Sequence, residues 1–505
     1  MAGDPIEEHA DDVSSSSDDC STDADDSGST YSDDSSSTDS DDRGSTDSDE
    51  SNSTDSDESS STHSDVSSSA EGDPADTHDP DGVGSSDDDS DVEPDDMVFV
   101  MCNRADMLRR LRTCGDTLHL VGVTPDLSAY EALAEHLTHN ETLTELRIEH
   151  ALSDEGILLL ADSLKFNCTL KNLILDYNAI IDPGMKAMAE ALKVNTALLK
   201  LDLFGACFRE AGCKALAQAL EANQTLTSLS LGGCNLRAET CRALTEGVKN
   251  NTGLLILSFS ENHLSNEGAV SLAKSLKWNR TLTGLWLADN GVGSRGCAAL
   301  AEGLKENTAL AVLDLSKNDL SDGGGKALGS MLLLNRALRR LHLTDSGIGD
   351  EGCAALADGL RHNTTIESLN LARNYGSTLG CKALSASLKY NESLTSLVLS
   401  CNDFCDECCV VMAESLEVNR TLRHLNLLGT FFGKKGEAAM TKMLKCNFTL
   451  LQILTDKDKK LSRNKKLAVN AVLQNVTKPM VLANPVHFAG EELSLEIKEI
   501  IARYI

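Results

Sequence analysis

The apolar positions of residues 140–446 repeat with a period of 27 or 28 residues, and each unit reads N-x-x-L-x-x-L-x-L-x-x-N-x-L-x-x-x-G-x-x-x-L-A-x-x-L. In one clear unit, Leu285 and Leu287 are two residues apart, so they point to the same side of a strand. Leu300 and Leu304 are four apart, on one face of a helix. The asparagine after the strand is expected to hydrogen-bond neighbouring backbone where the chain turns. The pattern therefore predicts eleven stacked units of strand, loop and helix, because only stacked copies bury a continuous core.

Both ends of the repeat region have sequences that suit caps, which a stacked core needs for solubility. Residues 97–139 combine a short helical stretch with a degenerate repeat. Residues 447–505 begin as a further repeat and end in Glu491–Ile505, a candidate amphipathic helix with one apolar stripe. We predict that this helix seals the end of the core, and docking of a partner on it is the alternative.

The 28-residue unit of strand and helix resembles the ribonuclease-inhibitor-like class of leucine-rich repeats. In its residue pattern it is similar to the repeat regions of NOD-like receptors and of stand-alone intracellular leucine-rich-repeat proteins. Ribonuclease inhibitor and the Ran GTPase-activating protein share the class. The resemblance implies an α/β solenoid, a right-handed horseshoe with a parallel sheet on the concave face and helices outside. The sequence contains no G-x-x-x-x-G-K-[ST], so it departs from NOD-like receptors in lacking their nucleotide-binding module.

Residues 1–96 differ from the repeats because Asp, Ser and Thr dominate them. The first 100 residues contain 34 of the 79 acidic residues and a single basic residue, Arg43, so the rest of the chain is nearly neutral. So few apolar residues cannot offset the entropy of ordering the segment. We therefore predict a disordered acidic tail.

Ser-Thr pairs recur every eight residues in this tail, and each threonine has an aspartate three residues later. A hydroxyl followed by an acid at this spacing resembles the substrate pattern of acidophilic kinases of the casein-kinase type. The predicted phosphorylation sites are Thr22, Thr30, Thr38, Thr46, Thr54 and Thr62. The alternative is a solubilising tail that has no specific partner.

A nearly neutral repeat region has no electrostatic footprint for nucleic acid, and the acidic tail would be repelled by phosphate backbones and anionic membranes. The N-terminus has no basic and apolar leader, and no run of about 18 uncharged apolar residues could span a membrane. Without a secretion signal, the sixteen cysteines are expected to be reduced thiols. We therefore expect a cytoplasmic protein, with the nucleus as a second location, that binds neither nucleic acid nor membranes.

Cysteines fill one column at the start of the predicted helix, where other units have Ala, Gly or Met. The column contains Cys213, Cys241, Cys297, Cys353, Cys381 and Cys409. Buried thiols are expected there, because helices about 8–10 Å apart exceed the roughly 7 Å Cα limit of a disulfide. A second group within nine residues consists of Cys401, Cys405, Cys408 and Cys409. A zinc site or a redox-sensitive thiol is one interpretation of this group; packing is the other, since C-x3-C-x2-C-C is not a standard zinc finger.

The residues between and just beyond the strand leucines point away from the core and line the concave side. Three of them, Tyr177, Phe204 and Trp286, are aromatic anchors of the kind that dominates interface energetics. Acidic residues on the same surface would suit a partner with a basic surface. They are Asp176, Asp202, Glu261, Asp289 and Asp314. The alternative is that these carboxylates keep an exposed sheet soluble, although a large exposed aromatic is harder to explain in that way.

The sequence shows no catalytic constellation: it lacks G-x-S-x-G and H-E-x-x-H, and its twelve histidines have no paired spacing. We therefore predict a non-catalytic scaffold or adaptor, without cofactor or metal, that binds a protein partner on its concave face. The resemblance to the Ran GTPase-activating protein suggests small-GTPase regulation as an alternative, which through an arginine finger needs an arginine such as Arg147 or Arg373 at the rim. A nuclease inhibitor is a third interpretation, although the uniform period departs from the alternating 28- and 29-residue pattern of ribonuclease inhibitor.

Overall fold

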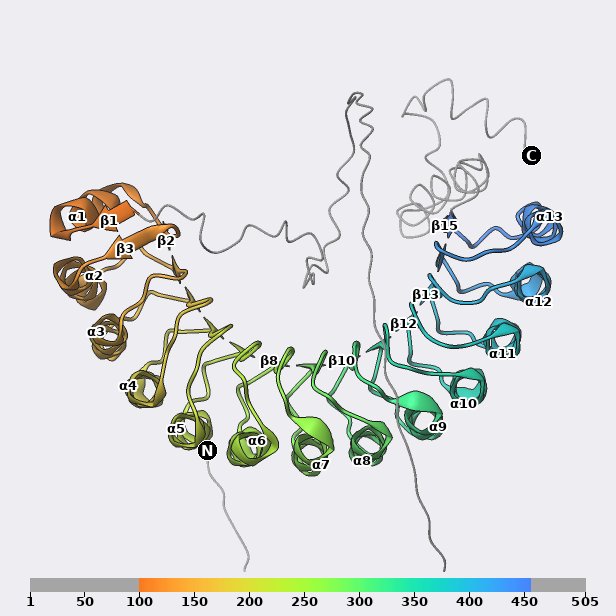
Figure 1. The fold of residues 1–505 in the computed structure, drawn as a ribbon, viewed down its shortest axis with the longest axis horizontal. Helices are drawn as coiled ribbons and strands as arrows, with labels where there is room; N and C mark the ends of the chain where they lie inside the picture. The colour runs from red at the N-terminus through yellow and green to blue at the C-terminus, as the bar shows by residue number, and fades with distance from the viewer. Residues whose placement is uncertain (1–99, 456–505) are drawn as a thin grey trace, which may run out of the picture. The chain divides into compact units, whose positions relative to one another are not determined.

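The computed structural model describes residues 100–455, which form an arc of stacked strand–helix units (Figure 1). The strands line the inner, concave side of this arc, and the helices lie on its outer, convex side. The predicted acidic tail with its six threonine sites, and the predicted terminal helix Glu491–Ile505, lie outside the described residues. The α/β solenoid predicted from the repeat is confirmed.

Within the described residues, thirteen strands pair in chain order into one parallel sheet. They are β2 (Thr117–Leu120), β4 (Glu145–Ile148), β5 (Asn172–Ile174), β6 (Lys200–Asp202), β7 (Ser228–Ser230), β8 (Ile256–Ser258), β9 (Gly284–Trp286), β10 (Val312–Asp314), β11 (Arg340–His342), β12 (Ser368–Asn370), β13 (Ser396–Val398), β14 (His424–Leu427) and β15 (Gln452–Thr455). Leu285 of β9 pairs with Leu313 of β10, one period later. This constant register places equivalent side chains of successive units in straight rows across the sheet. A separate two-stranded parallel sheet consists of β1 (Val100–Cys102) and β3 (Val123–Pro125).

Each described helix packs against its neighbours along the convex side. The helices are α1 (Arg104–Thr113), α2 (Leu127–His139), α3 (Asp154–Leu164), α4 (Asp182–Val194), α5 (Glu210–Ala222), α6 (Ala238–Asn250), α7 (Ser265–Leu276), α8 (Ser294–Leu304), α9 (Ser321–Leu332), α10 (Asp350–His362), α11 (Thr378–Ser387), α12 (Asp406–Val418) and α13 (Lys434–Met443). None of these helices is both long and apolar enough to cross a bilayer. The leucines of strand and helix, such as Leu285 and Leu300, are fully buried between the two layers.

The asparagine that opens each unit ties adjacent units together. Asn307 Nδ2 donates to the carbonyl oxygens of Leu276 (2.7 Å), at the end of α7, and Asn279 (3.1 Å). Its Oδ1 accepts from the backbone N–H groups of Ala309 (2.9 Å) and Leu310 (2.8 Å). Neighbouring units repeat this arrangement. A buried amide is therefore fully hydrogen-bonded, and it satisfies helix-end carbonyls that have no partner within the helix.

The asparagine after the strand also bonds backbone, as the sequence pattern predicts. Asn318 Nδ2 donates to the Leu287 carbonyl of the preceding unit (2.8 Å), and its Oδ1 accepts from the N–H groups of Asn290 (3.0 Å) and Val292 (2.9 Å). The residue before this asparagine position has a left-handed backbone in every unit from β4 to β14, whether or not the unit has the asparagine. That row contains His150, Tyr177, Gly205, Gly233, Glu261, Asp289, Lys317, Asp345, Arg373, Cys401 and Gly429. Because the whole row shares it, this unusual conformation belongs to the repeat and does not mark one site.

Several helices are capped by a side chain from the unit before them. Asp350, the first residue of α10, accepts hydrogen bonds through Oδ1 from the backbone N–H groups of Ser377 (2.7 Å) and Gly380 (2.8 Å), at the start of α11. Residues that cap α5, α8 and α13 in the same way are Asp182, Asn266 and Asp406. A carboxylate is favourable there because the N-terminal N–H groups of a helix lack partners and carry partial positive charge.

Candidate functional site

Three aromatic side chains form a row on the concave face near the N-terminal end of the arc. The rings of His150 and Tyr177 are stacked, with centroids 4.8 Å apart and planes 6° apart. Phe204 meets Tyr177 edge-on at 5.1 Å. Phe204 also covers the backbone of Gly232, where a Cβ would lie 2.6 Å from its ring. Tyr177 remains 51% exposed, so the row presents an apolar, accessible surface held in place by its neighbours.

Acidic side chains lie beside this aromatic row. The side chains of Asp176 and Asp202 are only 16% and 19% exposed, and each has one buried oxygen without a hydrogen-bond partner among the described residues. Arg147 pairs with Glu149 and with Asp176 (3.4 Å), and Lys200 lies 3.8 Å from Asp202. The side chains of these two aspartates are therefore mostly covered, and basic neighbours balance part of their charge.

Burial raises the pKa of Asp176 to about 6, with a further contribution from the negative charge of Asp202, and Arg147 opposes the shift. We call the set His150, Asp176, Tyr177, Asp202 and Phe204 the N-terminal patch. The sequence pattern identified four of these five residues but not His150. Its position in the repeat, equivalent to that of Tyr177, is the feature that could have identified it.

Trp286 does not belong to this cluster. It lies on β9, three strands beyond β6, which at about 4.8 Å per strand is roughly 14 Å from Phe204. Its ring is half-buried over Gly284, where a Cβ would lie 2.5 Å from Cζ3. The structure thus separates the three predicted aromatic anchors into one pair and one isolated ring.

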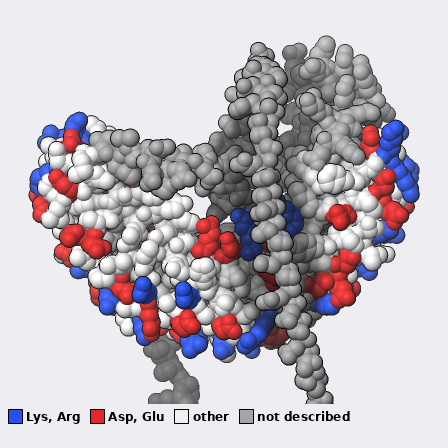
Figure 2. All heavy atoms as spheres, in the orientation of Figure 1, with Lys and Arg blue, Asp and Glu red and all other residues white. Residues whose placement is uncertain are grey.

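The remaining predicted acidic residues are spread over the middle of the arc. Glu261 and Asp289 are exposed, and the following residues of their row alternate in sign through Lys317, Asp345 and Arg373. Asp314 is half-buried and accepts a hydrogen bond from the backbone N–H of Ser316 (2.9 Å). Figure 2 shows charges of both signs interspersed along the outer edge of the arc. The predicted acidic residues therefore do not form one continuous surface: two lie in the N-terminal patch and three in the middle of the arc.

The two arginines considered for a GTPase finger differ in their surroundings. Arg147 is held in ion pairs by Glu149 and Asp176, so its guanidinium is already engaged on the concave face. Arg373 is exposed at the end of β12. Among residues 100–455, no contact of the Arg373 side chain marks it as a catalytic group.

The cysteine column is buried, as predicted, and burial raises the pKa of Cys213, Cys241, Cys297 and Cys353 to about 12. Such thiols are inert at neutral pH. Among residues 100–455, no group of three or more His, Cys, Asp or Glu side chains is arranged to hold a metal ion. The zinc interpretation of the second cysteine group therefore has no geometric support in that part of the chain.

Sequence reasoning missed a set of exposed apolar side chains at the C-terminal ends of the helices. Each directly precedes the asparagine that opens a unit, and this constant position in the repeat could have identified them from the sequence. They are Phe166, Val194, Trp278, Leu334, Tyr390 and Val418. Trp278 is 65% exposed, far more than the half-buried Trp286.

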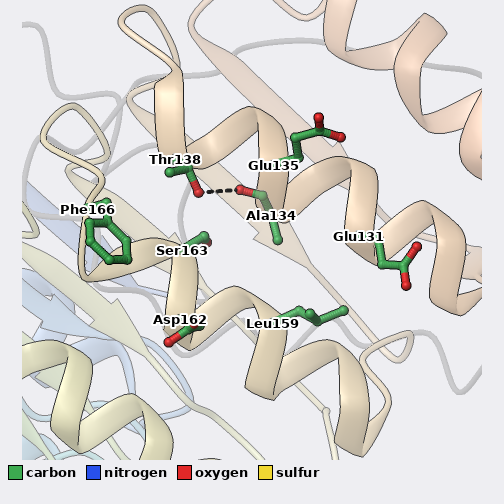
Figure 3. Close-up of a pocket in the computed structure, with 8 residues that line it drawn as sticks. All are labelled: Glu131, Ala134, Glu135, Thr138, Leu159, Asp162, Ser163 and Phe166. Atoms are coloured by element: carbon green, nitrogen blue, oxygen red, sulfur yellow. Dashed lines mark hydrogen bonds between the residues drawn. The ribbon is translucent and has the colours of Figure 1, made fainter.

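One groove on the convex side lies between α2 and α3 (Figure 3). Its lining consists of Glu131, Ala134, Glu135, Thr138, Leu159, Asp162, Ser163 and Phe166. Thr138 is engaged with the Ala134 carbonyl (2.8 Å), and Asp162 pairs with Lys165 (2.8 Å). Thr138 and Asp162 are therefore each engaged by a group of the same helix or its end.

Comparison with known proteins supports the same architecture. Seven segments match the Leucine Rich repeat family: residues 166–189, 222–244, 250–273, 279–301, 306–329, 334–357 and 390–410. Each matched segment coincides with a strand–helix unit of the described arc. The chain is a leucine-rich-repeat protein. The ribonuclease-inhibitor-like subclass stays a prediction, because the match describes the repeat in general.

No curated protein matches this leucine-rich-repeat chain. Among solved structures, it is similar to leiomodin-1 actin-binding site 2, at 17% identity and a TM-score of 0.26, over 37% of this chain and 95% of that one. It is also similar to an internalin from Listeria monocytogenes, at 18% identity and a TM-score of 0.39, over 66% of this chain and 94% of that one. Leucine-rich repeats generally mediate protein–protein interaction and are typically non-catalytic.

Proposed function

We propose that this protein is a non-catalytic interaction scaffold or adaptor that binds a protein partner at the N-terminal patch of its concave face. The observation that carries the proposal is the row of His150, Tyr177 and Phe204, in which the exposed Tyr177 is held between two other rings. Rigid aromatic side chains lose little conformational entropy on binding and bury a large area, so they are favoured anchors of interfaces.

The chemistry of the patch favours a partner that presents lysine or arginine. Asp176 and Asp202 each have one buried oxygen that no described residue hydrogen-bonds. A cationic side chain entering beside Tyr177 could pair with the carboxylate of Asp176 or Asp202 and lie against the ring, which combines a charge-assisted hydrogen bond with a cation–π contact. The partner would also remove water from the two carboxylates, so its own charge has to replace that solvation.

Affinity capture with the full-length protein tests the proposal. We expect one or more partners from a eukaryotic lysate to be lost by the double variant Tyr177→Ala/Phe204→Ala. The matched control is Phe166→Ala/Tyr390→Ala, which removes the same two residue types from exposed positions at the ends of α3 and α11 and should retain the partners. Circular dichroism establishes that both variants are folded. Equal capture by the two variants would rule out the N-terminal patch as the binding site.

A captured partner then allows the charge requirement to be measured. Asp202→Asn removes one of the paired carboxylates, and we expect it to weaken the purified complex about tenfold or more and to lower its salt dependence. Asp289→Asn, an exposed acid of the middle of the arc, is the matched control. If Asp202→Asn binds as tightly as the parent, a partner contacts the rings without using the carboxylates.

We place this binding in the cytoplasm or the nucleus, and we further propose that an acidophilic kinase phosphorylates the tail. The support is the eight-residue register of Ser-Thr pairs with aspartate three residues later. Incubating the full-length protein with a casein-kinase-type enzyme and mapping the phosphopeptides tests this, with Thr22, Thr30, Thr38, Thr46, Thr54 and Thr62 as the expected sites. Phosphate elsewhere in the tail, or none, would overturn the assignment.

A further inference from the structure

Cys405 and Cys408 form the only C-x-x-C sequence among the sixteen cysteines of the chain. They lie at the start of α12, where Cys405 is the N-cap residue and Cys408 is in the first turn. Their Sγ atoms are 3.6 Å apart, which is close to van der Waals contact. Cys408 is buried, whereas Cys405 is partly exposed and can be reached from solvent. The two thiols are thus paired by the helix start, with one of them accessible.

This helix start differs from its neighbours in two linked ways. Where α10 supplies Asp350 to cap α11, α11 supplies Thr378 at the equivalent position beside α12. Where α11 has Gly380, α12 has Cys408. A Cβ at Gly380 would lie 2.8 Å from the Asp350 carboxylate and 2.9 Å from Cys353 Cβ, so a side chain at this position is crowded beside Asp350. The two exchanges together place a thiol where other units have a capping carboxylate.

Contacts of the two sulfurs agree with this substitution. Cys405 Sγ lies 3.3 Å from Thr378 Oγ1, and Cys408 Sγ lies 3.6 Å from the Thr378 carbonyl oxygen. Threonine in place of aspartate therefore gives both thiols a neutral polar neighbour. At the start of α12, sulfur therefore occupies the place that the Asp350 carboxylate has at the start of α11.

The electrostatics separate Cys408 from the other buried thiols of the protein. A hydrogen bond from Cys381 is the main cause that lowers the pKa of Cys408 to about 6, against the opposing effect of burial. Hydrogen bonds from Cys405 and the charge of Lys382 act in the same direction. The same interaction, together with burial, raises the pKa of Cys381, so Cys381 retains its proton. The pKa of Cys408 is thus lowered, whereas burial raises the pKa of Cys213 and Cys297 in the packing column.

We propose that Cys405 and Cys408 form an oxidisable dithiol. It closes to a disulfide at the start of α12 by exchange with a small-molecule disulfide such as oxidised glutathione. Closing the S–S bond requires the sulfurs to approach from 3.6 Å to about 2 Å, which side-chain rotation can supply. The site is independent of the N-terminal patch, so neither proposal depends on the other.

The exchange proceeds in two balanced steps. The accessible Cys405 sulfur attacks one sulfur of the small disulfide, and the first small thiolate leaves, which produces a mixed disulfide on Cys405. The Cys408 thiolate then attacks Cys405 Sγ, and the second small thiolate leaves. The protein dithiol loses two electrons and its protons, the small disulfide gains them, and two small thiols are the products.

The test is to equilibrate the full-length protein with mixtures of reduced and oxidised glutathione, quench with acid, alkylate the remaining thiols and digest with trypsin. Trypsin releases residues 390–420 as one peptide, with four cysteines, and leaves Cys381 in a different peptide, residues 374–382. We expect the first peptide to lose two alkyl groups with rising oxidant, with Cys401 and Cys409 still alkylated. Buried Cys213 and Cys297 should stay fully alkylated after denaturation at every ratio.

Single variants fix the assignment. Cys408→Ser removes the resolving thiolate, so it should accumulate a mixed disulfide of glutathione on Cys405. Cys405→Ser should abolish the intramolecular disulfide, and Cys401→Ser, a matched control in the same peptide, should leave it unchanged. The proposal is overturned if residues 390–420 remain fully alkylated at every ratio. It is also overturned if oxidation instead joins the two tryptic peptides, because Cys381 would then be the partner of Cys408.

Discussion

Asp176 lies beside Asp202 on the concave sheet, and burial together with the charge of Asp202 raises the pKa of Asp176 to about 6. In the unfolded chain an aspartate titrates near 4. The folded state therefore binds this proton more tightly than the unfolded state. The favourable contribution of protonated Asp176 is fully present below about pH 4 and is lost as the pH rises through about 6. At neutral pH, the buried and ionised carboxylate destabilises the fold.

Replacing this carboxylate with an amide should therefore stabilise the protein at neutral pH. We expect Asp176→Asn to raise the free energy of unfolding by on the order of 1–3 kcal/mol at pH 7, with the difference from the parent shrinking towards pH 4. Loss of the partly exposed ion pair with Arg147 should offset little of this gain. Urea unfolding of parent and variant between pH 4 and pH 8 measures the difference. Asp289→Asn, at an exposed position, should give a constant difference within about 0.5 kcal/mol.

The cap that Asp350 provides to α11 predicts a destabilising substitution outside the core. Asp350→Ala removes an acceptor for the backbone N–H groups of Ser377 and Gly380. We expect a loss of about 1–2 kcal/mol in the free energy of unfolding, as for other helix caps. Asp358→Ala, an exposed aspartate later in the same helix, is the matched control and should have a far smaller effect. Equal midpoints of thermal unfolding for the two variants would contradict the claim that Asp350 stabilises the protein by capping α11.

The asparagine row predicts a larger loss at a polar position. Asn307→Leu leaves the carbonyl of Leu276 and the N–H groups of Ala309 and Leu310 buried without the partners that Asn307 supplies. Each unsatisfied group costs about 1–3 kcal/mol, so we expect a loss of at least about 3 kcal/mol. The same change at the exposed Asn250 should be close to neutral. A mild effect at Asn307 would show that water can replace its hydrogen bonds.

The arc and the cysteine column could be predicted because both depend on periodicity. Leucines at spacings of two and four identify strand and helix, and a constant period fixes the register between strands. A column that alternates among Cys, Ala and Gly indicates packing, and its thiols are buried. The cap by Asp350 was missed because it joins residues 27 and 30 apart in sequence, across the boundary between two units.

The surroundings of individual concave residues could not be predicted, because they depend on the side chains of adjacent units. The period places Phe204 and Trp286 in exposed rows, but it does not say that Phe204 reaches Tyr177 whereas Trp286 folds back over Gly284. It also does not reveal that the side chain of Asp176 is mostly buried and paired with Arg147. Periodicity therefore identifies the face on which a residue lies, and three-dimensional contacts determine its chemistry.

The contact between Gly284 and Trp286 offers an optical test of the concave face. A Cβ at residue 284 would lie 2.5 Å from Trp286 Cζ3, so Gly284→Ala must displace the indole towards solvent. The far end of a side chain can move at little cost, so we expect the free energy of unfolding to change by less than about 1 kcal/mol. Trp278, which is 65% exposed, would obscure the signal, so the measurement is made in a Trp278→Phe background.

In that background Trp286 is the only tryptophan, because the chain contains two. Gly284→Ala should shift its emission to longer wavelength and raise its quenching by acrylamide, since a ring lifted from the backbone becomes more accessible to water and quencher. Ser368→Ala, at the equivalent position of β12, adds no group near the indole and should leave both quantities unchanged. An unchanged spectrum for Gly284→Ala would mean that the ring already stands away from the sheet. Trp286 would then be an accessible anchor on the concave face, as the sequence alone suggests, instead of a ring held against its own strand.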